Sequence, residues 1–355
     1  MKIACITDTH FGARNDSQIF FDYFMKFYDE VFFPYLEKNG ITTVIHLGDI
    51  VDRRKFINFV VLHGFRNQFI KQFVDRGIDL HVLVGNHDTP YRNTNDINAM
   101  QELISEETIK LYSEPELMNF DGTDILMMPW INNGNFSKCM EVIDKTPAQI
   151  MFAHLEIMGF DTMAAGLKCD TGFDRKVFNK FDIVASGHFH HRSSQDNIQY
   201  LGAPYEMTWA DYGDPRGFNI FDTDKREFTF IQNPYKMHYK LFYDDSNKTA
   251  GDIMQADFSF VEDRYIKVVV VSKKNSLWFD SYLDRLYKFN PQKVTIIDDG
   301  RLRENFDGDL IVNEAEDTLT IINNRIDLIR DDAIDPNSVK QTIQRLYNEA
   351  LMMEY

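Results

Sequence analysis

Short apolar runs alternate with longer amphipathic stretches through the first part of the chain. Stretches 16–38 and 57–76 repeat their apolar residues with the period of a helix, and a glycine ends each of them. Shorter helices are expected at 96–104 and 137–144. Runs with the length of buried strands lie at 2–7, 43–47, 79–84, 124–128, 149–153 and 181–185. Strands separated by helices in this way predict the α/β class with a largely parallel sheet.

The pattern changes twice further along the chain. Alternating runs at 198–201, 218–221 and 227–231 predict an antiparallel second sheet that completes a sandwich. After Pro234, two β runs at 264–272 and 293–297 flank a helical stretch and predict a small βαβ domain. The predicted division is a main domain at 1–235, the βαβ domain at 236–300, an acidic linker at 301–335 and a terminal helix at 336–355.

Composition and charge restrict the class of protein. The chain has 355 residues, 44% of them hydrophobic, which is enough for a sizeable core. No apolar run approaches the roughly 20 residues of a membrane helix, and we expect no signal peptide and a cytoplasmic location. Cys5, Cys139 and Cys169 are scattered, which is typical of reduced thiols. The net charge of −17 is unfavourable for nucleic-acid binding unless positive surface is local or a partner supplies it.

Residues of metal-ligand type follow several of the predicted strands. They are Asp8 and His10, Asp49, Asn86 and His87, His154, and His188 and His190. Open α/β sheets place their ligands at the carboxyl ends of the strands, so we expect the tips of a single sheet to bring these residues together. Gly48 permits a sharp turn before Asp49, whose two carboxylate oxygens can bridge two cations.

Structural roles compete with chemical ones at several positions. A single histidine at a strand end is more often structural than catalytic, but those in the strand-end loops are interpreted together as site residues. Structural roles are expected for His46, His63, His81 and His238, and His191 is left between solvent and the surroundings of the site. The phenylalanines of 20–33 are interpreted as core, and segment 161–173, which has no clear period, as a mobile loop.

Two interpretations stay open for the charged residues near these loops. Asp52 either acts in the site or caps the helix that follows. Arg53 and Arg54, like Arg14 and Arg92, either form solvated surface or contact substrate phosphates.

The ordered series of motifs resembles a known superfamily. Asp-x-His, Gly-Asp-x-x-Asp-Arg, Gly-Asn-His-Asp, a single His and Gly-His-x-His follow one another as in the calcineurin-like metallophosphoesterases. Within them the chain is most similar to the SbcD-type DNA repair and recombination nucleases, and there to the recombination endonuclease subunits of T-even-type phages. The motifs cover about residues 1–230, and the later similarity is one of layout. The resemblance implies a metallophosphoesterase β-sandwich flanked by helices, with the βαβ domain as a cap.

The resemblance also implies a ligand set and a mechanism. One cation takes Asp8, His10, Asp49 and His190, and the other takes Asp49, Asn86, His154 and His188. His87 faces the scissile phosphate, with Asp52 as the group that orients it. Mixed imidazole and oxygen ligands suit manganese, iron or zinc better than magnesium, and the resemblance favours two manganese ions.

The implied function is that of a manganese-dependent DNA nuclease subunit. Double-strand 3′-to-5′ exonuclease and single-strand endonuclease activities are implied, in recombination, repair, replication and the processing of double-strand breaks. The implied partners are DNA, an SbcC-type coiled-coil ATPase bound by the terminal helix, and a second nuclease chain within a heterotetramer, without a membrane.

Two other functions compete with this one. A phosphomonoesterase of the protein-phosphatase type has nearly the same motifs, but Arg54 stands where those enzymes usually have Gly, and Asp88 where they usually have Glu. A non-catalytic scaffold that presents DNA to the ATPase would have no use for two metal sites.

Overall fold

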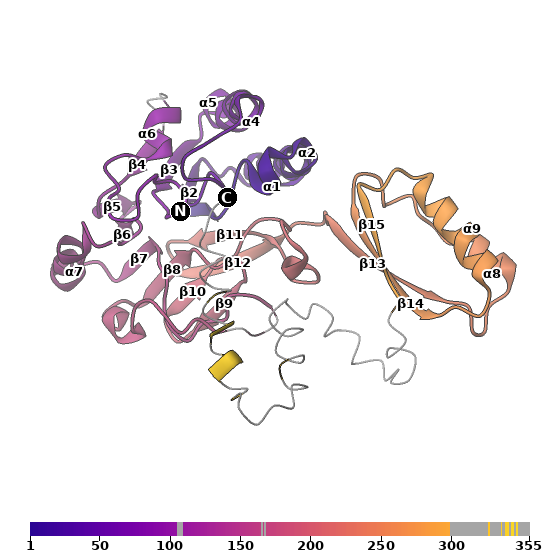
Figure 1. Ribbon diagram of the computed structural model, residues 1–355. Helices are drawn as coiled ribbons and strands as arrows, with labels where there is room; N and C mark the ends of the chain where they lie inside the picture. Colours follow the sequence, from indigo (N-terminus) through magenta and orange to yellow (C-terminus); the bar gives the residue numbers. More distant parts are fainter. Residues whose placement is uncertain are drawn as a thin grey trace. The chain divides into compact units, whose positions relative to one another are not determined.

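The computed structural model divides into two compact units, Met1–Met237 and His238–Tyr355. In the first unit, two β-sheets face each other (Figure 1). The structure describes residues 1–104, 109–164, 166, 168–298, 326, 335, 338–340, 342–343 and 346. No helix within these ranges is long and apolar enough to cross a membrane. The predicted linker 301–335 and terminal helix 336–355 lie outside the described residues, apart from the isolated positions just given.

The first sheet carries the strands that begin the chain. Within the described ranges it has six strands in the order β12-β11-β1-β2-β3-β4. The bounds are β1 (Lys2–Ile6), β2 (Thr43–His46), β3 (Asp79–Leu83), β4 (Ile109–Tyr112), β11 (Gly217–Asp222) and β12 (Glu227–Gln232). Strands β1 to β4 are parallel, with Ile6 beside His46 and His46 beside Val82. The carboxyl ends of β1, β2 and β3 therefore lie side by side.

The second sheet is also mixed. Its six strands, counted over the same described residues, have the order β5-β6-β7-β8-β10-β9. The bounds are β5 (Glu116–Phe120), β6 (Thr123–Met128), β7 (Ile150–His154), β8 (Ile183–Gly187), β9 (Ser193–Gln195) and β10 (Ile198–Tyr200). Strands β6, β7, β8 and β10 are parallel, and β5 and β9 add antiparallel at the two edges.

Helices border both sheets (Figure 1). Their bounds are α1 (Ala13–Asp16), α2 (Gln18–Phe27), α3 (Phe33–Asn39), α4 (Phe59–Gly64), α5 (Lys71–Arg76), α6 (Ala99–Leu103) and α7 (Phe136–Lys145). A π-helical turn joins α2 to α3, and another joins α4 to α5. Gly40 and Gly77 end α3 and α5 with positive φ, which glycine adopts without a steric penalty.

The core of the first unit has an aliphatic layer between the sheets and an aromatic layer under the helices. Ile3 and Ile45 of the first sheet belong to the same buried cluster as Ile150 of the second, which is the packing of a sandwich. Phe24 of α2 stacks on Tyr205 with ring centroids 3.7 Å apart. The phenylalanines of α2 and α3 are buried, which confirms the interpretation of this stretch as core.

The second unit contains a parallel sheet with the order β13-β14-β15. Its elements are β13 (His238–Asp244), α8 (Ala250–Met254), β14 (Tyr265–Ser272), α9 (Ser276–Tyr287) and β15 (Lys293–Ile297). Tyr282 and Leu286 of α9 are buried in one cluster with Val268 and Val270 of β14. The βαβ pattern is present, and β13 and α8 precede it in the same unit.

Several sequence-based expectations about the sandwich were wrong. The predicted antiparallel second sheet does not exist as such, because β11 and β12 join the first sheet at β1 while β10 joins the second. Strands β4 and β5 were not predicted. The helix expected from residue 57 begins at Phe59, and its N-cap is Asn58 rather than Asp52. Strand partners far apart in sequence leave no trace in local periodicity.

The contact between α4 and α2 generates a stability prediction. A Cβ added at Gly64 would overlap the ring of the buried Phe21. We expect Gly64→Ala to lower the free energy of unfolding by about 1–3 kcal/mol in urea denaturation, because overpacking outweighs the gain in helix propensity. Phe21→Leu in the same chain removes the ring edge, so the double variant should lose less than the sum of the single changes. Additive losses would contradict the proposed overlap.

Candidate metal centre

The predicted ligands lie where the ends of the two sheets meet. Asp8, Asp49 and Asn86 follow β1, β2 and β3 of the first sheet, whereas His154 ends β7 and His188 follows β8 of the second. The expectation of one sheet was therefore wrong. The residues still converge, because parallel neighbours such as β7 and β8 end together, with His154 beside Gly187.

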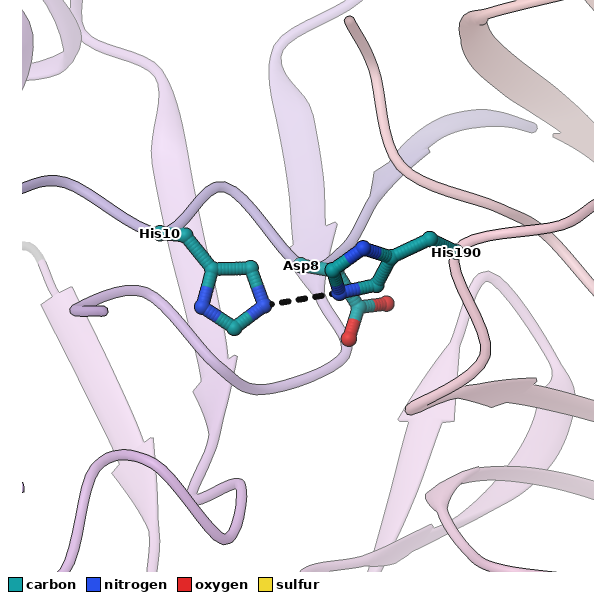
Figure 2. A group of neighbouring side chains, drawn as sticks. All are labelled: Asp8, His10 and His190. Atoms are coloured by element: carbon teal, nitrogen blue, oxygen red, sulfur yellow. Dashed lines mark hydrogen bonds between the residues drawn. The ribbon is translucent and has the colours of Figure 1, made fainter. Parts of the chain in front are cut away.

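Asp8, His10 and His190 form one group of candidate ligands (Figure 2). Each offers an atom within 4.8 Å of the others. Figure 2 shows their side chains pointing toward one another, and Nε2 of His10 lies 3.0 Å from Nε2 of His190. Asp8 and His10 are buried, so water does not satisfy these atoms freely.

Asp49, His154 and His188 form the second group. Oδ1 of Asn86 lies 2.9 Å from Nε2 of His154 and 2.9 Å from Nδ1 of His188. Nδ1 of His154 donates to the carbonyl oxygen of Leu47 at 2.7 Å, so Nε2 is the ring nitrogen that faces the group. The predicted second ligand set is thus assembled in space.

Asp49 lies between the two groups. Its Oδ2 is 3.4 Å from Nε2 of His154 in one group and 3.9 Å from Nε2 of His10 in the other. One carboxylate can therefore serve both positions, which is the arrangement that the motif series implied.

Close backbone approach makes glycine necessary around Asp49. A Cβ at Gly85 would overlap the Asp49 carboxylate, and one at Gly48 would lie 2.6 Å from Nδ1 of His154. Gly48 also has φ of 99°, in the left-handed region. The glycines before the two loops thus let the strand ends meet closely enough for shared ligands.

The ligand residues themselves have strained backbones. Asp8, His10, Asp49 and His188 all have positive φ, with values of 52°, 43°, 57° and 90°. Such conformations cost roughly 1–3 kcal/mol each and persist where the surroundings over-determine them. Their concentration in these loops is typical of a functional site.

The electrostatics of the two groups call for positive charge. Burial, together with the neighbouring His190, lowers the pKa of His10, and burial also lowers the pKa of His190, so both imidazoles are neutral and suited to metal ligation. Burial alone would lower the pKa of His154, but the Asp49 carboxylate raises it to about 9. Positive charge next to Asp49 is therefore favoured, and a divalent cation would supply it more strongly than a proton. The donor set fits a pair of such cations.

His87 and Asp52, the two predicted catalytic residues, are in contact. Nδ1 of His87 donates to the main-chain carbonyl oxygen of Asp52, whereas Oδ1 of Asp52 lies 3.6 Å from Nδ1 of His10. The contact to the ring is thus made by the main chain of Asp52, and the role of its carboxylate in orienting His87 stays a prediction. Burial by itself would lower the pKa of His87, but Asp49 and the Asp52 carbonyl raise it overall. These contacts therefore favour the protonated ring.

The arginines considered for phosphate contacts fall into different surroundings. Arg53 is paired with Asp16 and donates to Asn15. The guanidinium of Arg54 lies over the Trp130 ring, 5.6 Å from its centroid. Arg14 and Arg92 are exposed, and Arg14 lies on a left-handed turn with φ of 56°.

Two acidic residues near the ligands were not predicted as part of the site. The buried Asp88 carboxylate accepts hydrogen bonds from the backbone N–H groups of Gly85, Asp49, Ile50 and Val51. Oε2 of Glu156 lies 3.7 Å from Nε2 of His188, the ring nitrogen turned away from Asn86. The place of Asp88 directly after Asn86-His87 was the available signal, whereas Glu156 had none beyond its closeness to His154.

The chain belongs to the calcineurin-like phosphoesterase family, whose sequence profile matches residues 1–192. It is 34% identical over 287 residues to exonuclease subunit 1 of Enterobacteria phage T4, which covers 81% of this chain and 82% of the phage protein. It is 23% identical over 305 residues to the SbcD component of the nuclease SbcCD of Staphylococcus epidermidis, with 76% of each chain covered. The family predicted from the motif series is confirmed.

A solved structure described as a novel archaeal phosphodiesterase also aligns. It covers 65% of this chain and 99% of its own at 17% identity, and its TM-score of 0.32 is too low to support an argument.

The shared position of Asp49 leads to a prediction about metal content. We expect the chain to bind a pair of Mn²⁺ ions in calorimetric titration, and Asp49→Asn to weaken both sites, because one carboxylate faces both groups. Asp75→Asn, which breaks an exposed pair with Lys71, is the matched control and should leave the titration unchanged. Undiminished binding of both ions by Asp49→Asn would contradict the shared position.

Proposed function

We propose that this phosphoesterase is a DNA nuclease subunit that hydrolyses phosphodiester bonds with a pair of divalent cations. Manganese is the proposed metal. The observation that carries the proposal is the position of Asp49 between two candidate ligand groups with His87 beside them. The similarity over most of its length to a phage exonuclease subunit supports DNA as the substrate.

The candidate ligands form two sets, one for each cation. Asp8, His10 and His190 would hold one, Asn86, His154 and His188 the other, and Asp49 both. When bound, such a pair of cations stabilises the attacking and leaving oxygens of an in-line displacement.

His87 supplies the proton chemistry in this proposal. Its backbone N–H donates to Oδ1 of Asp49 at 2.8 Å, and its Nδ1 is occupied by the Asp52 carbonyl. The other ring nitrogen, Nε2, is then available to donate to a phosphoryl oxygen or to protonate the leaving oxygen. The raised pKa of His87, which Asp49 and the Asp52 carbonyl cause against the effect of burial, favours the protonated ring that this role needs.

Arg54 is the candidate phosphate contact best supported by its surroundings. Its guanidinium lies over the Trp130 ring, 5.6 Å from the ring centroid, where the face of the ring attracts a cation. Its charge also acts on the pKa of His87, so it lies near the proposed proton donor. Arg53 is less suited because Asp16 already pairs with it.

The proposal extends to an assembly. Both named relatives are components of larger nucleases by their names, and a net charge of −17 opposes contact with DNA by this chain alone. The proposed assembly therefore includes an SbcC-type ATPase, which binds through residues 336–355 and supplies basic surface. The second unit of this chain is proposed to act as a cap. A second copy of the chain is supported by the exposed apolar side chains of Phe56, Phe59 and Val60, which are 70%, 85% and 65% exposed.

The nuclease proposal is separated from the phosphomonoesterase alternative by substrate. We expect the chain with Mn²⁺ to cleave supercoiled plasmid and a labelled DNA duplex, to leave a phosphopeptide intact, and to stop when the metal is chelated. The assay should be repeated with the ATPase partner added. Phosphate release from the peptide without DNA cleavage would favour the alternative.

The role of His87 can be tested apart from metal binding. We expect His87→Gln to keep the Mn²⁺ content of the wild type and to lower the cleavage rate by about 10²–10⁴-fold, the usual contribution of a general acid. The exposed His63→Gln is the control and should cleave at the wild-type rate. Normal turnover of His87→Gln at equal metal content would rule out the role.

A further inference from the structure

A buried ionic cluster lies directly behind the loop that carries His188 and His190. Nη2 of Arg216 is 2.7 Å from Oδ1 of Asp211 and 3.0 Å from Oδ2 of Asp214. The three side chains are only 3–6% exposed. Oδ2 of Asp211 accepts the backbone N–H groups of Met207 and Thr208, each at 2.8 Å, which fixes this carboxylate in turn.

The cluster holds the backbone of a predicted ligand. The second terminal nitrogen of Arg216, Nη1, donates to the carbonyl oxygen of His190, which also accepts the N–H of Ala203 at 3.0 Å. The next residue is bound as well, since Nδ1 of His191 lies 3.0 Å from Oδ2 of Asp214. His191, left open in the sequence, thus belongs to the support of the loop.

The two imidazoles of this loop have separate supports. The backbone N–H of His188 is held by the Asp8 carboxylate at 3.1 Å, and its ring faces Asn86 and Glu156. His190, two residues later, faces His10 and is held through Arg216. A change at Arg216 therefore acts first on the group of Asp8, His10 and His190.

Stability alone does not account for such a cluster. Buried ion pairs are frequently no more stabilising than apolar side chains of similar volume. The planar fork of an arginine, by contrast, can hold two carboxylates and a carbonyl oxygen in one fixed geometry, which a lysine cannot reproduce. The contacts of Arg216 are of this kind.

We propose that Arg216, held by Asp211 and Asp214, is a positioning residue for His190. It controls how fully a cation occupies the Asp8–His10–His190 position and leaves occupancy of the second cation position unchanged. This inference rests on the proposed two-cation centre and deepens it. Supports of this type around metal-binding histidines commonly contribute about 10–100-fold in metal affinity.

The test measures binding of Mn²⁺ alone by calorimetry and electron paramagnetic resonance. The wild type should bind a pair of ions and show the signal of two coupled Mn²⁺ centres. Arg216→Met should keep one ion at wild-type affinity, bind the second about 10–100-fold more weakly, and show the signal of an isolated ion. Arg216→Lys should recover part of the loss, because its ammonium keeps the charge but not the fork.

A matched control and a milder variant complete the design. Arg226→Met removes an exposed arginine that pairs with Asp182, and both ions should bind as in the wild type. If circular dichroism shows that Arg216→Met does not fold, the same binding measurement is made on Asp214→Asn. We expect this variant to lose less Mn²⁺ affinity, at the same cation position. Equal binding of both ions by the folded variant, or equal weakening of both, would overturn the proposal.

Cleavage provides an independent outcome. Raising the Mn²⁺ concentration should restore DNA cleavage by Arg216→Met, because the defect lies in occupancy. A wild type that binds both ions but does not cleave DNA would refute the nuclease function and leave the role of Arg216 standing. DNA cleavage by the wild type, combined with unaltered metal binding by Arg216→Met, would refute the role of Arg216 and leave the nuclease function standing.

Discussion

The position of one carboxylate, that of Asp49, limits how the whole site can be built. It has to reach His10 on one side and His154 on the other, and these residues come from different sheets. That reach requires bare backbone at Gly85, where any side chain would overlap the carboxylate. The buried Asp88 then ties the turn in place by accepting backbone N–H groups from both loops. The sandwich thus serves to bring two sheet edges within the span of a single side chain.

Buried charge explains why this arrangement suits cations. A carboxylate removed from water is costly unless it is paired, and Asp49 accordingly raises the pKa of His154 against the effect of burial. The imidazoles of His10 and His190 have lowered pKa values and stay neutral, so they offer lone pairs instead of competing charge. Burial makes the unpaired Asp49 carboxylate unfavourable, because water cannot solvate it. A divalent cation bound beside it would remove this cost more effectively than water. The local field of the site, rather than the net charge of the chain, decides what binds there.

The loop that carries His188 and His190 is supported by one motif residue, Asp8, and by Arg216, which lies outside the motifs. The loop after β8 carries one imidazole for each ligand group, and Asp8 and Arg216 hold it at different points. The left-handed φ of His188 persists because such contacts over-determine the loop. Phosphodiester chemistry with two cations would depend on this stiffness, because both ions have to keep their separation while the phosphorus geometry changes.

The order of residues alone was enough to predict which candidate ligands lie together and which strand each one follows, because the motifs are local and each glycine stands within a few residues of its candidate ligand. It also predicted the aromatic core of α2 and a structural role for His46, which is buried and hydrogen-bonded in the fold. The folded chain was needed to learn that the ligands come from two sheets, that β11 pairs with β1, and that Arg216 lies behind His190. These features depend on contacts between distant segments, and the periodicity of a strand records its buried face but not its neighbour.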